Sequence, residues 1–310
     1  MFNGEAKTKE EVIRSALLLN VKLNEIYVED CLKFMPKLGV GTIDVIVTSP
    51  PYNLKKKYSK YRDNKERREY LEWMSNVAEV TSTILKEDGS FFLNVGGRPS
   101  DPWLEFDIAK EFNKHYHLQN VIHWIRHISF PKDTFVKTNP MNGDLSFGHF
   151  KPINTNTYLN QCHDYIFHFT KTGRVQLDKL AIGVSYQHKS NVTRWKEKRD
   201  LRDRGNVWFI RYENKQGAVE PILHPTAFPE KLPYLCIKLH GIKKGMVTYD
   251  PFMGIGTTAL ASLTLGVDYV GTEIDGRYVR VAKRRISQRI GELKVTRNLS
   301  QTKLIVQAQT

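Results

Sequence analysis

Cysteine is scarce in this chain of 310 residues, which contains only Cys31, Cys162 and Cys236. They stand far apart without a Cys-x-x-Cys pair, so the sequence predicts neither a metal site nor a disulfide framework. Long apolar runs are missing too, since none approaches the roughly 20 residues that span a bilayer. The N-terminal segment also lacks the arrangement of a secretory signal. These absences predict a cytoplasmic protein that has no membrane partner.

Acidic residues are outnumbered by basic ones, with 47 Lys and Arg against 33 Asp and Glu and a formal net charge of +14. Basic side chains gain affinity for nucleic acids because they displace counterions from the phosphates. The excess therefore favours a polyanionic partner, and a merely basic surface is the alternative.

Short apolar strands alternate with helices through much of the sequence. Residues 43–47 and 90–95 are apolar runs typical of buried strands, and apolar side chains recur at helical spacing over 65–85. We interpret Gly89 as the terminator of that helix. Further strands are predicted at 26–28, 121–125, 246–249 and 269–272, and helices at 229–240, 257–265 and 278–290. This alternation predicts an α/β fold with a mainly parallel central sheet.

The alternation lapses between residues 130 and 206, apart from one predicted strand at 165–169. The end of this region is dense in Lys and Arg, and its aromatic residues are too frequent for a solvated tail. We interpret it as an insertion or second lobe. The predicted organisation is a first half at 1–129, the basic insertion at 130–206, a second half at 207–295 and a C-terminal tail at 296–310.

A glycine loop, residues 250–258, follows a predicted strand and precedes a predicted helix. Gly254 and Gly256 let the backbone approach a ligand at the carboxyl edge of a sheet. The next strand ends at Glu273, which is placed to accept both hydroxyls of a ribose. The loop lacks the lysine of a phosphate-binding loop and the third glycine of the dinucleotide pattern. Asp250 would repel a diphosphate and favours the positively charged S-adenosylmethionine; a tight turn without a ligand is the alternative.

A double proline ends the predicted strand at 43–47, in the segment Thr48-Ser49-Pro50-Pro51-Tyr52. The prolines fix two φ angles and carry no N–H donors, so the turn is rigid and rich in acceptors. The Ser49 hydroxyl and the Pro50 carbonyl would be two acceptors, and Tyr52 an aromatic wall. Such a cup suits the exocyclic amino group of a flat base.

Together, the two motifs resemble those of the amino-methylating DNA methyltransferases. Residues 48–52 are similar to the catalytic motif of that family, and residues 250–256 are similar to its S-adenosylmethionine loop. The catalytic segment precedes the cofactor loop, which resembles the order in the β group of the family. The resemblance covers most of residues 22–290. It implies a circularly permuted, Rossmann-like methyltransferase fold with a basic target-recognition insertion at 130–206, S-adenosylmethionine as cofactor, and double-stranded DNA whose target base is flipped out.

The resemblance also implies a role for particular residues. Catalysis is expected of Ser49, Pro50, Pro51 and Tyr52. Asp30 would bind the cofactor adenine, Phe252 would pack against it, and the segment that starts at His224 would support the methionine moiety, unless it is only a turn leading into a helix. The expected cofactor residues are Asp30, Cys31, Thr48, His224, Thr226, Asp250, Pro251, Phe252, Gly254, Gly256, Thr257, Thr258 and Glu273.

DNA contacts are expected at two places in the sequence. Four residues directly follow the catalytic motif, and eight belong to the insertion. They are Lys55, Lys56, Lys57 and Tyr58, and Lys189, Arg194, Trp195, Lys196, Lys198, Arg199, Arg202 and Arg204. A solvated charged face is the alternative for the second group.

The target base is left open by the chemistry, because cytosine and adenine both carry an amino group beside a ring nitrogen. A serine before the two prolines resembles the cytosine-N4 members and favours cytosine, with adenine-N6 as the alternative. No cysteine lies near the motifs, which argues against cytosine-C5 methylation. We expect a site-specific enzyme of a restriction-modification system, a monomer or homodimer, with a cognate restriction endonuclease as a further partner. An RNA or protein methyltransferase and a non-catalytic nucleic-acid-binding protein are the rival hypotheses.

Overall fold

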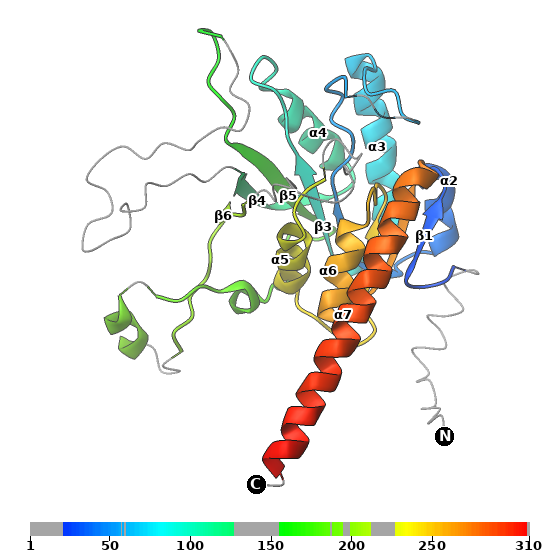
Figure 1. Ribbon diagram of the computed structural model, residues 1–310. Coiled ribbons are helices and arrows are strands. Elements are labelled where there is room, and N and C mark those ends of the chain that lie inside the picture. Colours follow the sequence, from blue (N-terminus) through cyan, green and yellow to red (C-terminus); the bar gives the residue numbers. More distant parts are fainter. Residues whose placement is uncertain are drawn as a thin grey trace.

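One mixed sheet organises the described part of the chain. The computed structural model describes residues 21–56, 58, 60–126, 155–186, 188–194, 199–211 and 227–308. Eight strands pair in the order β1-β8-β7-β2-β3-β5-β4-β6 (Figure 1). They are β1 Glu25–Val28, β2 Ile43–Thr48, β3 Leu85–Val95, β4 His117–Ile125, β5 His163–Thr170, β6 Val207–Phe209, β7 Val247–Asp250 and β8 Asp268–Glu273. Only β5 runs antiparallel to its neighbours, so the predicted mainly parallel α/β sheet is confirmed.

Helices cover both faces of this sheet (Figure 1). One face carries α2 Cys31–Phe34, the 3-10 turn η1 Met35–Leu38, α3 Arg67–Ile84 and α4 Leu104–Phe112. The other carries α5 Lys231–His240, α6 Thr257–Leu265 and α7 Gly276–Ala308. In β2 the side chain of Ile46 packs on the first face, and those of Val45 and Val47 pack on the second. Because both faces are buried, the strand is apolar throughout rather than alternating.

Helix α3 begins at a capping acid and ends earlier than Gly89. The Glu66 side chain accepts the backbone N–H of Arg68 at 2.8 Å, which satisfies a free N–H group of the first turn. The helix ends at Ile84, and Gly89 lies inside β3. A Cβ on Gly89 would lie 2.7 Å from Leu85 Cγ and 3.0 Å from the Asp44 carbonyl oxygen. The interpretation of Gly89 as a helix terminator is therefore wrong; the residue permits close packing between β2 and β3.

The predicted boundaries do not coincide with structural units. Strand β5 lies within 130–206, yet it pairs between β3 and β4 in the central sheet. Strand β6 pairs with β4 at the edge opposite β1. Helix α7 crosses the predicted start of the tail at residue 296 and extends beyond the sheet (Figure 1). None of the helices in the described residues is long and apolar enough to cross a membrane.

Two buried histidines share one hydroxyl beneath the sheet. Ser90 Oγ lies 3.0 Å from His168 Nε2 and 2.9 Å from His240 Nδ1. The His168 ring also stacks on Phe92 at a centroid distance of 4.4 Å. Burial lowers the pKa of His168 to about 3, because the charged imidazolium loses its hydration.

This shift predicts a pH-dependent stability. The pKa of His168 is lowered on folding, so its stabilising contribution is complete above its unfolded value of about 6.5. It is lost as the pH falls below that value, by about 1.4 kcal/mol per pH unit. His168→Gln has no titrating group at this position. The unfolding free energy of the wild-type protein minus that of this variant therefore isolates the effect of His168 from that of the buried carboxyls, whose contributions change with pH in the opposite direction. Urea denaturation between pH 7.5 and 5 measures it, and a difference independent of pH would contradict the assignment.

Candidate active site

Asp250 joins the two sequence motifs, which lie side by side because β2 and β7 are neighbours in the sheet. Thr48 Oγ1 donates to Asp250 Oδ1 at 2.6 Å, and Thr258 Oγ1 donates to Asp250 Oδ2 at 2.7 Å. The Phe252 N–H donates to Oδ1 at 3.0 Å. Burial raises the pKa of Asp250 to about 6, against the lowering effect of these donors. The carboxylate therefore bridges the catalytic segment and the glycine loop.

This arrangement corrects the expected role of Asp250. From the sequence we predicted that the Asp250 carboxylate contacts the positive groups of the cofactor. The side chain is instead only 1% exposed and faces hydrogen-bond donors of the protein. Thr48 and Thr258 are completely buried and bond to the same carboxylate. Thr257 is buried as well, with Arg285 Nη1 donating to its hydroxyl at 3.5 Å. These residues support the loop and the catalytic segment from the protein interior and do not line the site.

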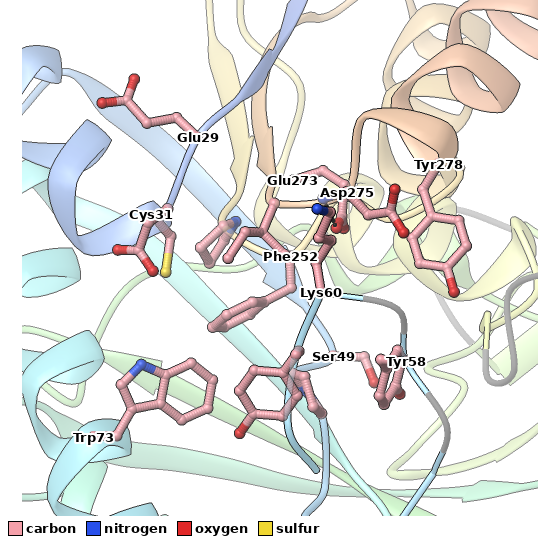
Figure 2. Close-up of a pocket in the computed structure, with 15 residues that line it drawn as sticks. Glu29, Cys31, Ser49, Tyr58, Lys60, Trp73, Phe252, Glu273, Asp275 and Tyr278 are labelled. Atoms are coloured by element: carbon pink, nitrogen blue, oxygen red, sulfur yellow. Dashed lines mark hydrogen bonds between the residues drawn. The ribbon is translucent and has the colours of Figure 1, made fainter.

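A pocket of about 690 Å³, including the part open to solvent, lies at the carboxyl ends of the central strands (Figure 2). Predicted residues supply about half of the wall, and the other half was missed. The lining consists of Glu29, Asp30, Cys31, Ser49, Pro51, Tyr58, Lys60, Tyr61, Trp73, Pro251, Phe252, Glu273, Ile274, Asp275 and Tyr278.

The wall of this pocket combines carboxylates with aromatic rings. Glu273 accepts the N–H groups of Gly254 and Asp275, each at 2.9 Å, so its carboxylate is fixed at the end of β8. Burial raises its pKa. Asp30 caps α2 through Oδ1, which accepts the Leu32 N–H at 3.0 Å. Each carboxylate retains lone pairs for hydroxyl or amino donors of a ligand.

Phe252 and Trp73 supply the aromatic part of the pocket. Their rings meet edge to face, with centroids 5.4 Å apart. Figure 2 shows Cys31, Phe252, Glu273 and Tyr278 around the same space. An adenosine binds between flat apolar faces and hydrogen-bond acceptors. The aromatic rings and carboxylates of this pocket therefore fit a nucleoside cofactor such as S-adenosylmethionine. Trp73 was missed because its place on α3 made it look like an ordinary core residue.

The two loop glycines have different tasks. Both adopt positive φ angles, 53° at Gly254 and 83° at Gly256. The N–H of Gly254 points to Glu273 beside the pocket. At Gly256, a Cβ would lie 2.9 Å from Ala282 Cβ. Gly256 therefore permits close contact between the loop and α7. From the sequence we had predicted that this glycine permits an approach to the cofactor.

A matched pair of substitutions separates these effects. Gly256→Ala combines a left-handed backbone cost of about 1–2 kcal/mol with overlap against Ala282, worth about 1–3 kcal/mol more. Gly266, the C-cap of α6, has a φ of 67° and open space around it, so Gly266→Ala should show the backbone cost alone. Urea denaturation of both variants measures the difference. Equal destabilisation would mean that the contact with α7 is unimportant.

The catalytic motif is held by hydrogen bonds from two neighbouring elements. Ser49 Oγ and the Tyr52 hydroxyl lie 2.5 Å apart. Asn94 Nδ2 donates to the Tyr52 hydroxyl at 2.6 Å and to Ser49 Oγ at 3.3 Å. The Tyr70 hydroxyl donates to the Pro51 carbonyl at 2.8 Å. The result is a preorganised turn in which Ser49 faces the pocket.

Asn94 is the member of this network that sequence reasoning missed. It is 1% exposed, and its Oδ1 has no hydrogen-bond partner among the described residues. The available signal was a polar residue inside the apolar run at 90–95, next to a strand that ends in the catalytic motif. Tyr52 also differs from expectation, since its hydroxyl is engaged and burial raises its pKa. Its ring packs partly on the core and does not line the pocket.

The segment after the catalytic motif folds around one carboxylate. Asp63 accepts the N–H groups of Asn53, Leu54 and Lys56 at 2.8, 3.1 and 2.9 Å. Lys55 and Lys56 are exposed, as DNA contacts require. Tyr58 lines the pocket together with Tyr61, and its contact with DNA stays a prediction.

The basic insertion is only partly within the described residues. Lys189 and Arg194 delimit η3 Lys189–Arg194, and Lys189 forms an ion pair with Asp200. Arg199 and Arg202 are exposed. Arg204 is half-buried and donates through Nε to the Ile182 carbonyl at 2.8 Å, so it anchors backbone rather than presenting itself to DNA. Six predicted site residues lie outside the described ranges: Lys57, Trp195, Lys196, Lys198, His224 and Thr226.

Comparison with known proteins assigns the family. The sequence model of the N6_N4_Mtase family, described as DNA methylase, matches residues 43–284. The chain therefore belongs to this family of DNA amino-methyltransferases, as its two motifs predicted. Its cofactor is S-adenosylmethionine, whose fit to the pocket is given by the acids and aromatic rings described above.

Relatives of known activity span most of this chain. It is 27% identical to the type II methyltransferase M.BglII of Bacillus subtilis, over 86% of this chain and 69% of that protein. It is 24% identical to the DNA adenine methyltransferase YhdJ of Escherichia coli strain K12, over 83% and 80% of the two chains. The fold matches the cytosine-N4-specific PvuII DNA methyltransferase with a TM-score of 0.59 at 19% identity, over 86% and 90%. TTHA0409 of Thermus thermophilus, solved in complex with S-adenosylmethionine, matches with a TM-score of 0.53 at 20% identity, over 86% and 95%.

Proposed function

We propose that this DNA methyltransferase methylates the N4 amino group of cytosine at a specific site, as the modification enzyme of a restriction-modification system. The single observation that carries the proposal is Ser49, whose hydroxyl lies at the pocket and closes the catalytic turn. Serine there resembles the cytosine-N4 members. The type II names among the relatives support a cognate restriction endonuclease as a partner.

The hydrogen-bond network suggests how Ser49 acts. Asn94 Nδ2 can only donate, so the Tyr52 hydroxyl accepts from it. Either hydroxyl could donate in the contact between Tyr52 and Ser49 Oγ, and we assign Tyr52 as the donor. The second lone pair of Ser49 Oγ receives only the long contact of 3.3 Å from Asn94 Nδ2, which an N–H of the target base would displace. A chain of donors polarises its last member, so Ser49 becomes a stronger acceptor than an isolated hydroxyl.

The remaining protein groups hold the base in place. Flipping it out of the duplex costs a few kcal/mol. The Tyr52 ring is half-buried against the core, and the part that stays exposed is the stacking surface beside Ser49, outside the pocket described above. The Pro50 carbonyl accepts a hydrogen bond from the second amino hydrogen, which helps to draw the nitrogen lone pair out of ring conjugation. The proton that the nitrogen loses when it is methylated passes to solvent. S-adenosylmethionine supplies an electrophilic methyl group on its sulfonium sulfur. Asp30, Phe252 and Glu273 orient the cofactor, so most of the rate gain is positional.

Adenine-N6 methylation is the second candidate, and the likeness to the adenine methyltransferase YhdJ favours it. One assay separates the candidates. The protein is incubated with plasmid DNA and labelled S-adenosylmethionine, and the DNA is digested to nucleosides. We expect label in N4-methylcytosine. Label only in N6-methyladenine would replace the proposal by the second candidate, and unlabelled DNA would refute both.

A further inference from the structure

A polar cluster, which we call the acid–arginine cluster, consists of the buried acids Glu105 and Asp164 and the half-buried Arg126. Arg126 Nη1 lies 3.1 Å from Asp164 Oδ1. Arg126 Nη2 donates to the Gln161 carbonyl at 3.0 Å, and Gln161 Nε2 donates to Glu105 Oε1 at 2.9 Å. The cluster joins α4, the end of β4 and the start of β5.

Several hydrogen-bonding atoms of the cluster have no hydrogen-bond partner among the described residues. Glu105 and Asp164 are each 3% exposed. Glu105 Oε2 and Arg126 Nε are buried without a hydrogen-bond partner among the described residues, and Asp164 Oδ1 has only the ion pair. An unsatisfied buried group costs about 1–3 kcal/mol, so the unpaired Arg126 Nε donor is unusual unless an acceptor of a ligand completes it. Burial raises the pKa of Asp164 to about 6 and also raises that of Glu105.

The two glycines that directly follow β3 leave room for this cluster beside the catalytic turn. A Cβ on Gly96 would overlap the Asp164 carboxylate, and one on Gly97 would overlap the Glu105 carboxylate. Gly96 stands two residues after Asn94, so the Asp164 carboxylate occupies the face of β3 on which the Asn94 side chain lies. Asn94 in turn contacts Ser49 and Tyr52.

The spacing across the sheet matches the size of a base. The sheet order places Ser49 at the end of β2, Asn94 on β3, Asp164 on β5 and Arg126 beyond β4. Adjacent strands are about 4.8 Å apart, so two spacings separate Ser49 from Asp164. A pyrimidine ring with one hydrogen bond of about 2.9 Å at each end spans a similar length. A base whose amino group meets Ser49 can therefore turn the rest of the same edge, which carries N3 and O2 in cytosine, toward the acid–arginine cluster.

We propose that the acid–arginine cluster is the wall of the base pocket that reads the ring, with the Arg126 guanidinium donating to N3 and O2 of the flipped cytosine. This inference rests on the proposed function. Cytosine carries these two acceptors in a row beside its amino group, whereas adenine offers N1 alone on that edge. The planar fork of an arginine suits two adjacent acceptors, and Asp164 holds the fork in place. Arg126 contacts the substrate ring; Asp164 and Glu105 are positioning residues.

Arg126→Lys tests this assignment without removing the charge beside Asp164. Once the methylated site is known, duplexes are prepared that contain either cytosine or 3-deazacytosine, which lacks the N3 acceptor, at the target. With the wild-type protein we expect kcat/KM on 3-deazacytosine to be about 10- to 100-fold lower, the range of one good bidentate base contact. With Arg126→Lys we expect a similar loss on cytosine and little further loss on 3-deazacytosine, because the same interaction is removed twice.

The outcomes are distinct. Arg204→Lys, at a half-buried arginine that bonds to a backbone carbonyl, should keep the wild-type ratio between the two duplexes. Thermal unfolding and cofactor affinity report whether each variant is folded. If Arg126→Lys is folded and the two losses multiply, Arg126 acts only on structure and the inference is overturned, while the proposed function stands. Methylation of adenine alone, or of no base, overturns the inference together with the proposed function.

Discussion

Replacing Ser49 with alanine is expected to slow methyl transfer by about 100- to 1,000-fold, the loss typical when one preorganised polar contact to the reacting group is removed. The substitution removes the acceptor that faces the pocket. It leaves intact the Thr48 to Asp250 hydrogen bond that joins the motif to the glycine loop. Fold and cofactor affinity should therefore persist. Single-turnover transfer of a labelled methyl group to DNA measures the rate.

Tyr52 provides the matched comparison for Ser49. Tyr52→Phe keeps the stacking ring and removes the hydroxyl that is hydrogen-bonded to Ser49, so a smaller loss is expected, about 10-fold for one hydrogen bond. Tyr52→Ala removes the ring as well and should approach the loss seen with Ser49→Ala. Full activity of Ser49→Ala and Tyr52→Ala would remove the catalytic turn from the proposed mechanism.

Glu273→Gln is expected to weaken S-adenosylmethionine binding by about 100-fold, which corresponds to the loss of charge-assisted hydrogen bonds worth about 1.5–3 kcal/mol each. The effect has two sources. The ribose hydroxyls lose an ionised acceptor, and the new amide group opposes the N–H of either Gly254 or Asp275. Isothermal titration calorimetry of the cofactor measures the affinity.

Glu29→Gln is the control for the loss of negative charge at the same pocket. Glu29 lines the pocket but pairs with Lys37 at 2.7 Å on the surface. Its substitution should change the affinity by less than about threefold, since exposed ion pairs contribute little. Equal weakening by both substitutions would indicate a general electrostatic effect and would contradict a specific contact from Glu273.

The sequence predicts the fold well because each strand and helix is indicated by residues close together in the chain. Strand β2 is an apolar run that stops at two prolines, and the loop at 250–258 places glycines between a strand and a helix. Such patterns determine which elements form, and the parallel sheet brings their carboxyl ends together. Helix α7 was underestimated because the absence of Pro, rather than any apolar pattern, lets it continue to Ala308.

The site is predicted less completely because contacts across the sheet leave no local signal. Asn94 and Trp73 reach the site from β3 and α3, at distances along the chain that no motif records. Asp250 carries the charge expected of a cofactor ligand, but neighbouring threonines turn it inward. Arg204 likewise belongs to a basic stretch, but its side chain turns to the Ile182 carbonyl, to which it donates a hydrogen bond. Side-chain direction depends on the partners that folding supplies.

The most direct test of the account is a crystal structure with S-adenosylhomocysteine and a duplex that contains the methylated site. We expect a cytosine outside the duplex with its amino nitrogen within hydrogen-bond distance of Ser49 Oγ, its ring against Tyr52, and the cofactor sulfur on the side of Phe252 and Glu273. A target base that stays stacked in the duplex, or an amino group that faces away from Ser49, would contradict the claim that the two motifs form one methyl-transfer site.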